Sequence, residues 1–422
     1  MQLREKELNW AGNLAYGAKE LLYPTSIEQL REHVHVAKSV KVLGSRHSFN
    51  DIVDTGELMI SLAKMPAEIK IDPQAMSVRV SAGITYGALA DVLQEAGFAL
   101  HNLASLPHIS VAGAVSTGTH GSGETHGNLA TAVSAVELVL ADGSLMTVQR
   151  GDEDFNGMVV GLGALGVLTH LTLDILPAFE VQQTVFEDLS WDKVLNDFDA
   201  VQASAYSVSL FTDWSGDHVG QTWLKRRVGD ALVDDIDQGK FDGLPAIAAV
   251  HPLPGADGAI CSIQLGETGP WSDRLAHFRM DFMPSAGDEL QSEYLVPREH
   301  AVAAIQTIRK LSPVITPLLL ISEVRTIAAD ELWLSGNYDR DGIALHFTWK
   351  PQQKAVEAIL PQIEEALASF AARPHWGKLF AAQVSELGSL YPKFNNFIAL
   401  ADRLDPAGKF RNEYLRRTVF GT

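Results

Sequence analysis

The sequence predicts a two-domain α+β protein, and three observations support this expectation. The chain has 422 residues, more than the roughly 250 that one hydrophobic core usually serves, so a large core and a second one are expected. Hydrophobic residues make up 46% and charged residues 20%, as in packed soluble proteins. Segments with strand periodicity alternate with segments of helix periodicity along the chain, without an internal repeat.

Strand and helix signals alternate through the first part of the chain. Thr25 with Glu28 forms a capping-box pattern, which predicts a helix of about three turns before a strand at 40–43. A second helix over 86–97 is predicted to end at Gly97. Its apolar face consists of Leu89, Val92, Leu93 and Ala96. Further strands with alternating apolar residues are predicted at 58–63, 69–71 and 76–82.

A dense supply of glycine, serine and threonine marks residues 104–127, where neither a helix nor a long strand is predicted. Asp142-Gly143 between two alternating runs then predicts a hairpin over 136–149. Residues 161–176 end in another strand, which Pro177 closes. We place the first domain boundary near residue 180.

The second half predicts a mixed sheet with helices packed on one face, because strands are interleaved with helices. The expected helices cover 298–311 and 353–371. The expected strands are 206–214, 221–227, 290–296, 318–327 and 343–350.

Composition also bears on function. A formal net charge of -19 repels phosphate backbones and anionic lipid, which argues against nucleic-acid and membrane partners. Cys261 is the single cysteine, so no intrachain disulfide or cysteine-based zinc site can form, as suits a reducing cytoplasm. The polar N-terminal residues do not resemble a signal peptide, and no stretch approaches the ~20 apolar residues of a membrane span. A cytoplasmic monomer is expected.

Two apparent motifs are rejected. Residues 161–166, GLGALG, match the dinucleotide pattern G-x-G-x-x-G, but that pattern needs a helix starting at the glycines. The following residues alternate like a strand, which argues against a nicotinamide cofactor. His120 and His126 are separated by flexible glycines and match no rigid ligand spacing, so no metal site is expected.

Two glycine-rich loops, at 44–48 and 110–123, can bind phosphate groups, because successive backbone N–H groups form an anion-binding concavity. The pair suggests a pyrophosphate held from both sides. The alternative is that one or both loops are only turns.

Strand alternation predicts a polar wall in the second half. Glu323 and Arg325 share one strand face, and Gln291 pairs with Glu293 on another. A third strand presents His346, Thr348 and Lys350 opposite Leu345, Phe347 and Trp349. A solvated sheet face would alternate in the same way, but three such strands favour a pocket for a ligand with many hydroxyl groups. A loop adds His375 and Lys378.

These motifs together resemble the vanillyl-alcohol-oxidase flavoprotein superfamily, and most closely the alditol (xylitol/sorbitol) oxidases of its sugar-lactone-oxidase branch. The resemblance covers nearly the whole chain, and the combination of motifs is specific where single motifs are weak. The motifs run from NWAGN at 9–13 through LGSRHSFN, NLASLPHISVAGAVSTGTHGSG, GALGVLT, LQSEYLVPREH, EVRT, HFTW and RPHWGK to LDPAGKF at 404–410.

The resemblance implies a PCMH-type FAD-binding domain over 1–180 and a substrate-binding domain over 181–380. It also implies that a C-terminal segment, 381–422, packs back on the FAD domain. In the family, the histidine at the position of His47 is bonded covalently to the 8α-methyl carbon of FAD. Arg46 occupies a position where many members have glycine. The other residues implied to contact FAD are Val42, Leu43, Gly44, Ser45, Arg46, Ser48, Ser105, Ser110, Gly113, Ser116, Thr117, Gly118, His120, Gly121, Gly166, Val167 and His375.

The implied activity is oxidation of the terminal primary hydroxyl of a linear polyol to the aldose, with dioxygen reduced to hydrogen peroxide. Arg325 and Lys378 would stabilise the developing alkoxide, and His346 would transfer the proton. The residues implied to bind the polyol are Ser105, Gln291, Glu323, Arg325, Thr348 and Lys378.

Two alternatives stay open at this point. An aldonolactone oxidase or dehydrogenase of the same branch is the nearest, since access of dioxygen depends on packing around Ala104. A sugar-binding flavoprotein without turnover is the alternative from another class.

Overall fold

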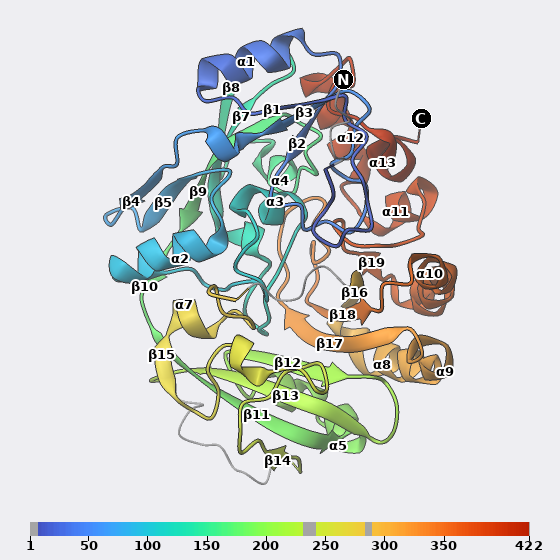
Figure 1. Ribbon diagram of the computed structural model, residues 1–422. Coiled ribbons are helices and arrows are strands. Elements are labelled where there is room, and N and C mark those ends of the chain that lie inside the picture. The colour runs from blue at the N-terminus through green and yellow to red at the C-terminus, as the bar shows by residue number, and fades with distance from the viewer. Residues whose placement is uncertain (1–6, 231–241, 283–288, 422) are drawn as a thin grey trace.

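The computed structural model describes residues 7–230, 242–282 and 289–421 (Figure 1). Residues up to about 180 and the C-terminal helices α11 (Val384–Leu390), α12 (Phe394–Leu404) and α13 (Glu413–Leu415) form the upper part of Figure 1, and a large sheet lies below them. Among the described residues, no helix combines the length and apolar character needed to cross a lipid bilayer.

A small parallel sheet carries the first glycine-rich loop. Its strands are ordered β1 (Glu20–Leu22), β3 (Leu58–Ser61) and β2 (Val40–Leu43), and α1 (Ile27–Val36) connects β1 to β2. The predicted cap of α1 is wrong by one residue. Ser26 is the N-cap, and its hydroxyl accepts from Gln29 N at 3.3 Å. The Thr25 N–H donates to the Gln29 side chain instead, so the polar residues before the helix share the capping differently.

An antiparallel sheet of five strands forms the other layer of this part. The predicted hairpin is confirmed, with Gly143 at φ +80 in its turn. The strand order is β4 (Ile69–Asp72), β5 (Ser77–Ser81), β9 (Val167–Asp174), β7 (Val133–Val139) and β8 (Leu145–Gln149). Pro177 does not simply close β9, because β10 (Leu176–Pro177) pairs with β6 (Phe98–Ala99).

Helix α2 (Tyr86–Glu95) buries Leu89 and Leu93 as predicted, and Gly97 follows it at φ +81. The prediction that Val92 and Ala96 lie on the buried face is wrong, since both are exposed, Val92 by 37%. Residues 104–127 were also predicted wrongly as free of helix. A short helix, α3 (Val111–Ser116), forms there because Val111, Ala114 and Val115 make a buried stripe at helical spacing.

No helix begins at residues 161–166, as the rejection of the nicotinamide motif requires. Gly166 has φ +154 and enters β9 directly. A Cβ at this position would lie 2.8 Å from Val139 O, so only glycine allows β9 to approach β7 here. A short helix, α4 (Phe155–Met158), precedes the loop.

The lower sheet contains nine strands within the described residues. All its pairings are antiparallel, so the predicted mixed sheet is wrong in this detail. The reason is that β16 and β17, which α8 (Ala301–Lys310) connects, lie on either side of β18. The order is β14 (Leu244–Pro245), β11 (Glu180–Ser190), β13 (His218–Arg227), β12 (Ser207–Thr212), β17 (Leu319–Ile327), β18 (Gly342–Trp349), β16 (Leu290–Pro297) and β19 (Arg373–Pro374), and β15 (Thr268–Pro270) also pairs with β11.

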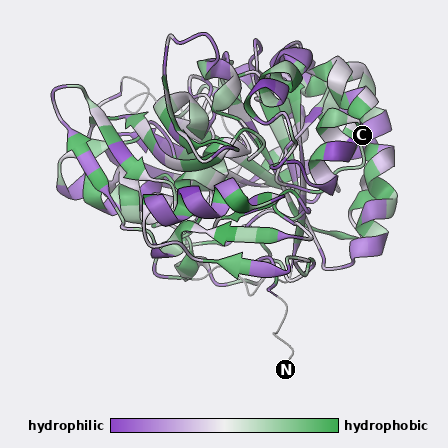
Figure 2. Ribbon diagram, turned by 90° about the horizontal axis from the view of Figure 1, so that it is seen from above, coloured by the Kyte–Doolittle hydropathy of each residue, from purple (hydrophilic) through white to green (hydrophobic). Residues whose placement is uncertain are grey.

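Helices cover one face of this sheet, as predicted. Leu345, Phe347 and Trp349 of β18 belong to the same buried cluster as residues from those helices. The helices at the rim of the molecule carry hydrophobic and hydrophilic residues around their circumference, as expected for helices with one buried side (Figure 2). The helices that cover this face of the sheet are α5 (Trp191–Asn196), α6 (Phe198–Gln202), α8, α9 (Ser312–Ile315) and α10 (Gln353–Leu367).

The C-terminal segment returns to the first part of the chain. Lys409 Nζ donates to Val34 O at 2.6 Å and to Ala141 O at 2.6 Å, joining the segment to two separate elements. The predicted division at residues 180 and 380 agrees with this packing and stays a prediction. The helices α11, α12 and α13 contribute Leu387, Phe397, Leu400 and Tyr414 to the core that the first part forms.

Candidate functional site

A cavity of about 700 Å³ lies between the glycine-rich loops and the uncovered face of the lower sheet. Its wall brings together residues that are distant in sequence, including His47, Ser110, Glu323 and Lys378. The predicted site residues that line it are Val42, Leu43, Gly44, Ser45, Arg46, His47, Ser48, Ser105, Ser110, Gly113, Ser116, Thr117, His120, Gly166, Gln291, Glu323, Arg325, His346, Thr348, His375 and Lys378.

Three predicted cofactor residues do not line the cavity. Gly118 is buried beside Val160, and Gly121 packs against the Asn102 side chain. Val167 is the first residue of β9 and lies in the core. Neighbouring residues of the same segments line the cavity, whereas these three are buried beneath its surface.

His47 stands in the loop directly after β2, as predicted. Its ring is stacked on Trp10, with centroids 5.4 Å apart and planes at 23°. Burial lowers the pKa of His47 to about 4, so the imidazole is neutral at neutral pH. Nδ1 is buried and has no hydrogen-bond partner among the described residues. The ring also lines the cavity, where it can contact a ligand.

The two glycine-rich loops meet beside this histidine. Ser45 Oγ accepts from Ser110 N at 3.0 Å, which joins one loop to the other. A Cβ at Gly44 or at Gly113 would lie 2.8 Å or 2.7 Å from Ser110 Oγ, so a side chain at either position would displace this hydroxyl. Ser110 Oγ is itself buried with no partner in the described part of the chain. Backbone amides and a free hydroxyl at the wall fit the pyrophosphate of a dinucleotide.

Glu293 of β16 is the centre of the polar wall, and it is 1% exposed. Its carboxylate accepts from Lys378 Nζ at 2.8 Å and from Arg325 Nη2 at 3.0 Å. His120 Nε2 lies 3.4 Å away. Burial raises the pKa of Glu293, but Lys378 and His120 outweigh it, and the pKa lies well below the usual range. One ionised carboxylate thus pairs with both cations.

Lys378, His346 and Thr348 form a chain of hydrogen bonds beside Glu293. Lys378 Nζ is 2.7 Å from His346 Nδ1, and His346 Nε2 is 3.1 Å from Thr348 Oγ1. An ammonium at Lys378 requires Nδ1 to accept, so Nε2 carries the ring proton. Burial lowers the pKa of His346 to about 4 and also lowers that of Lys378. The chain of hydrogen bonds connects the neutral His346 imidazole to the Lys378 ammonium.

Glu323 and Arg325 of β17 form a second pair of charges. His277 Nε2 lies 2.7 Å from Glu323 Oε1, and Arg325 Nε lies 3.5 Å from the same oxygen. Burial raises the pKa of Glu323, but Arg325 and then His277 lower it by more, so the carboxylate is ionised. Arg325 Nη1 also donates to Ser105 Oγ at 3.4 Å, which links this wall to residues 104–127.

Sequence reasoning missed several groups. Glu293 was placed on the same strand face as Gln291, a usable signal, but it was not chosen as a site residue. His277 and Trp10 lie in loops without periodicity, so no local pattern marks them. Lys225 is fully buried on β13, where its Nζ donates to the carbonyls of Arg274, Leu275 and Ala276 at 2.7 Å, 2.8 Å and 2.7 Å. It fixes the backbone that carries His277.

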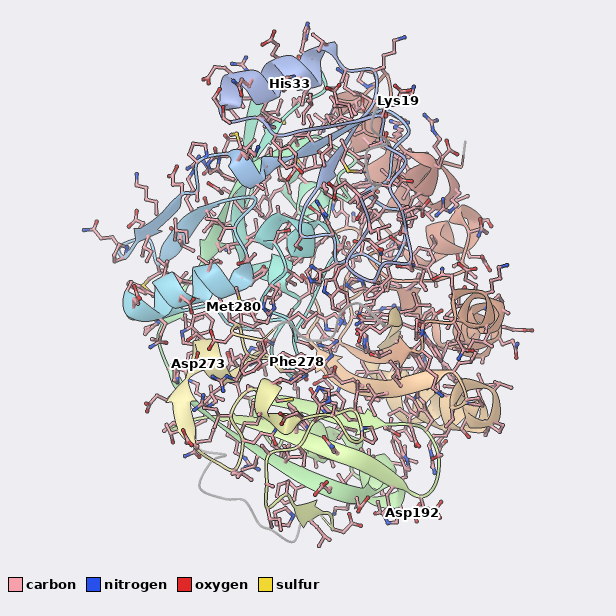
Figure 3. The ribbon with its side chains drawn as sticks, in the orientation of Figure 1. Lys19, His33, Asp192, Asp273, Phe278 and Met280 are labelled. Atoms are coloured by element: carbon pink, nitrogen blue, oxygen red, sulfur yellow. The ribbon has the colours of Figure 1, made fainter. Side chains whose placement is uncertain are left out.

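An apolar wall adjoins the polar one, because Phe211 pairs with Glu323 across two neighbouring strands and shares its sheet face. Figure 3 places Phe278 above the lower sheet and Met280 near α2, where Met280 packs against Gly87. The sequence did not predict this wall, which comes from a loop and from two strands. Its residues are Phe211, Pro252, Leu253, Ile260, Phe278 and Ile321.

His120 and His126 lie in different surroundings. His120 lines the cavity, while the His126 ring packs on Tyr206 with centroids 4.1 Å apart. Among the residues with defined positions, no group of three or more His, Cys, Asp or Glu side chains could hold a metal ion.

Comparisons with known proteins show which families the chain is similar to. Residues 18–149 match the FAD binding domain family, and residues 283–418 match the D-arabinono-1,4-lactone oxidase family. An alditol oxidase from a Streptomyces species is 48% identical over 98% of this chain and 99% of its own length. The L-gulonolactone oxidase of Bos taurus is 28% identical over 98% of both chains.

Comparison with solved structures shows which fold the chain shares. Cholesterol oxidase from B. sterolicum superposes with a TM-score of 0.78 at 15% identity, covering 98% of this chain and 96% of that one. Likeness at this level of identity concerns architecture only. It confirms the predicted α+β fold, while the FAD-binding domain rests on the family match of residues 18–149.

Proposed function

Because the chain belongs to the alditol oxidase family of FAD-dependent oxidoreductases, we propose that it oxidises the terminal hydroxyl of a linear polyol. Xylitol and sorbitol are the proposed substrates, the aldose is the product, and dioxygen is reduced to hydrogen peroxide. The observation that carries the proposal is a pair of cations, buried Arg325 and the partly exposed Lys378, on the wall of a cavity that His47 also lines.

The cofactor would occupy the part of the cavity between the two glycine-rich loops. FAD, when bound, accepts the hydride that leaves the alcohol carbon. We propose that His47 forms the covalent link to it, supported by the buried and unpartnered Nδ1 among the described groups. The backbone around Gly44 and Gly113, with Ser110 Oγ, would hold the pyrophosphate.

Arg325 and Lys378 would stabilise negative charge as the hydroxyl loses its proton. Fixed cations in a buried site stabilise a developing alkoxide without reorganisation at the moment of reaction. His346 would move the proton through Lys378: Nδ1 of the neutral ring, in hydrogen-bond contact with Lys378 Nζ, would take a proton from that ammonium as Lys378 receives the hydroxyl proton, so Lys378 keeps its charge. Glu293 would keep both cations in place, since it accepts from each of them.

The remaining polar residues would hold the other hydroxyl groups of the polyol. Glu323 and Arg325 present an acceptor and a donor from the same strand face, as bidentate recognition of a diol requires. Thr348, Gln291 and Ser105 add neutral partners. Each of these side chains lines the cavity.

The nearest alternative is oxidation of an aldonolactone, favoured by the match of residues 283–418 to the D-arabinono-1,4-lactone oxidase family. The rate at which each substrate reduces the bound flavin without oxygen separates the two. Faster reduction by gulonolactone than by xylitol would favour the alternative.

We also propose a cytoplasmic location and a monomer. The one cysteine, Cys261, is free and buried, which suits a reducing compartment. Size-exclusion chromatography with light scattering tests the monomer, and a dimer mass would contradict it.

Acid precipitation of the purified protein tests the cofactor link. We expect yellow colour to remain in the pellet of the wild type and to appear in the supernatant for His47→Ala. Colour released from the wild type would refute the covalent link and leave the fold assignment unchanged.

A further inference from the structure

Residues 9–13, here called the N-terminal brace, bind the loop that carries His47. The backbone N–H of Trp10 donates to Arg46 O at 2.9 Å. Two asparagine side chains donate to carbonyls that follow His47, so the brace is bonded to the loop on both sides of His47. These bonds are Asn9 Nδ2 to Ser48 O at 3.0 Å and Asn13 Nδ2 to Phe49 O at 3.0 Å.

The brace also contacts the imidazole itself. Trp10 is stacked on His47, and its edge meets Phe49 with ring centroids 6.3 Å apart and planes at 85°. A ring stacked on one face and fixed through its backbone cannot rotate without losing these contacts. The brace therefore sets the direction of the His47 ring nitrogens.

Arg46 explains why this chain needs such support. Its φ is +67, in the left-handed region that favours glycine, so the turn before His47 is strained. Two contacts stabilise the turn. The N–H of Trp10 in the brace donates to Arg46 O, and Glu7, just before the brace, forms an ion pair of 2.7 Å with Arg46. Without these contacts the turn would relax and move the histidine.

We propose that Trp10 is a positioning residue, which orients the His47 ring for attachment to FAD. This inference rests on the proposed covalent link. Attachment breaks one N–H bond of His47 and one C–H bond of FAD and forms an N–C bond. The two protons and two electrons released reduce dioxygen, the co-substrate already proposed, to hydrogen peroxide. The attachment thus balances without another oxidant.

The test follows attachment rather than turnover. Apo-protein is mixed with FAD in air, samples are denatured at intervals, and covalent flavin is read from fluorescence in the gel. We expect Trp10→Leu to attach FAD roughly tenfold to a hundredfold more slowly, because a shift of about 1 Å in a reacting group has effects of this size. Trp10→Phe keeps a ring against His47 and should restore most of the rate.

Trp333→Leu is the matched control, since Trp333 is also half-buried but does not line the cavity. It should attach FAD as the wild type does. Noncovalent FAD binding, measured with each ring variant in a His47→Ala background, should be retained, which separates orientation from loss of the fold. Should Trp10→Leu fail to fold, Trp10→Ala rescued by added indole gives the same comparison.

Attachment at the wild-type rate in folded Trp10→Leu would overturn the inference alone. A wild type that releases all its FAD on denaturation would overturn both the covalent link and the inference. Equal slowing in Trp10→Leu and Trp333→Leu would also overturn it, because a general loss of stability would then explain the effect.

Discussion

At the scale of the residue, the site is built from buried charges that compensate one another. Glu293 and Glu323 are ionised, and Arg325 and Lys378 are paired with them at distances of 2.8–3.5 Å. Breaking one buried pair leaves an uncompensated charge, which is costly in a region of low dielectric constant. Single substitutions here should therefore act on several groups at once.

We expect Glu293→Gln to slow the reduction of bound flavin by xylitol on the order of a hundredfold, because both cations lose their fixed position. Loss of the carboxylate removes a group that raises the pKa of Lys378, so the alkaline limb of the pH profile should move to lower pH. Stopped-flow absorbance without oxygen measures both effects.

Glu364→Gln is the control for this variant. Glu364 accepts from Tyr294 Oη at 2.8 Å on the helix-covered side of the same strand, β16. It should leave flavin reduction unchanged. An equal loss in the two variants would contradict the role given to Glu293.

Individual residues differed in how far the sequence could place them. Period-two alternation assigned Glu323, Arg325, His346 and Thr348 to the cavity face, because side chains on a strand have only two directions. His277 could not be predicted as a site residue, because its loop has no periodic pattern and only the tertiary fold brings it to Glu323.

At the scale of the element, strands and long helices followed from local patterns, while short ones did not. The stripe in α10 includes Val356, Ile359 and Ile363, which are buried as the helical spacing indicated despite Pro361. In α3 the glycine at position 113 concealed a helix of six residues, whose formation depends on packing of Val111 and Val115. The antiparallel direction of the strands in the lower sheet could not be predicted either, because local patterns do not encode which strands are neighbours.

The segment that carries His277 depends on Lys225. We expect Lys225→Met to lower the free energy of unfolding by about 2–3 kcal/mol, because three buried carbonyls lose their donor. The KM for xylitol should rise, since His277 contacts Glu323. Urea unfolding and steady-state kinetics measure the two effects.

Lys193→Met provides the comparison for Lys225→Met. Lys193 pairs with Asp197 at 2.9 Å on the exposed side of α5, and such pairs contribute at most about 0.5 kcal/mol. Similar losses of stability in both variants would show that Lys225 does not fix the segment.

At the scale of the whole molecule, the cavity lies between the first part of the chain and the lower sheet, and the returning C-terminal segment supports the residues that follow the His47 loop. Asn412 Nδ2 donates to Asp51 O, Ile52 O and Asp54 O at 3.0 Å, 3.1 Å and 2.8 Å, just beyond the loop of His47. Family motifs anticipated this return, but hydrophobic patterns alone did not, since they carry no information about distant partners.

Stability should fall on mild acidification. Burial lowers the pKa of His126 and of His346 to about 4, whereas an unfolded histidine titrates near 6.5. The unfolded chain therefore binds protons first as the pH falls from about 6.5 to 4, and the free energy of unfolding decreases over that range. The slope is about 1.4 kcal/mol per pH unit for each such histidine.

Urea unfolding at pH 7, 6 and 5 checks this prediction. Glu293 and Glu323, whose pKa values are also lowered, should extend the decrease below about pH 4.5. A free energy of unfolding that stays constant between pH 7 and pH 5 would contradict it. In His346→Gln, the free energy of unfolding should fall less steeply with decreasing pH, by the contribution of one histidine.

The measurement that tests the central claim most directly is the absorbance of the oxygen-free holoenzyme after addition of xylitol. The account predicts that the flavin band bleaches, that admission of dioxygen restores it with release of hydrogen peroxide, and that Lys378→Met bleaches far more slowly. A wild-type flavin that keeps its colour with both xylitol and sorbitol would contradict the proposed polyol oxidation.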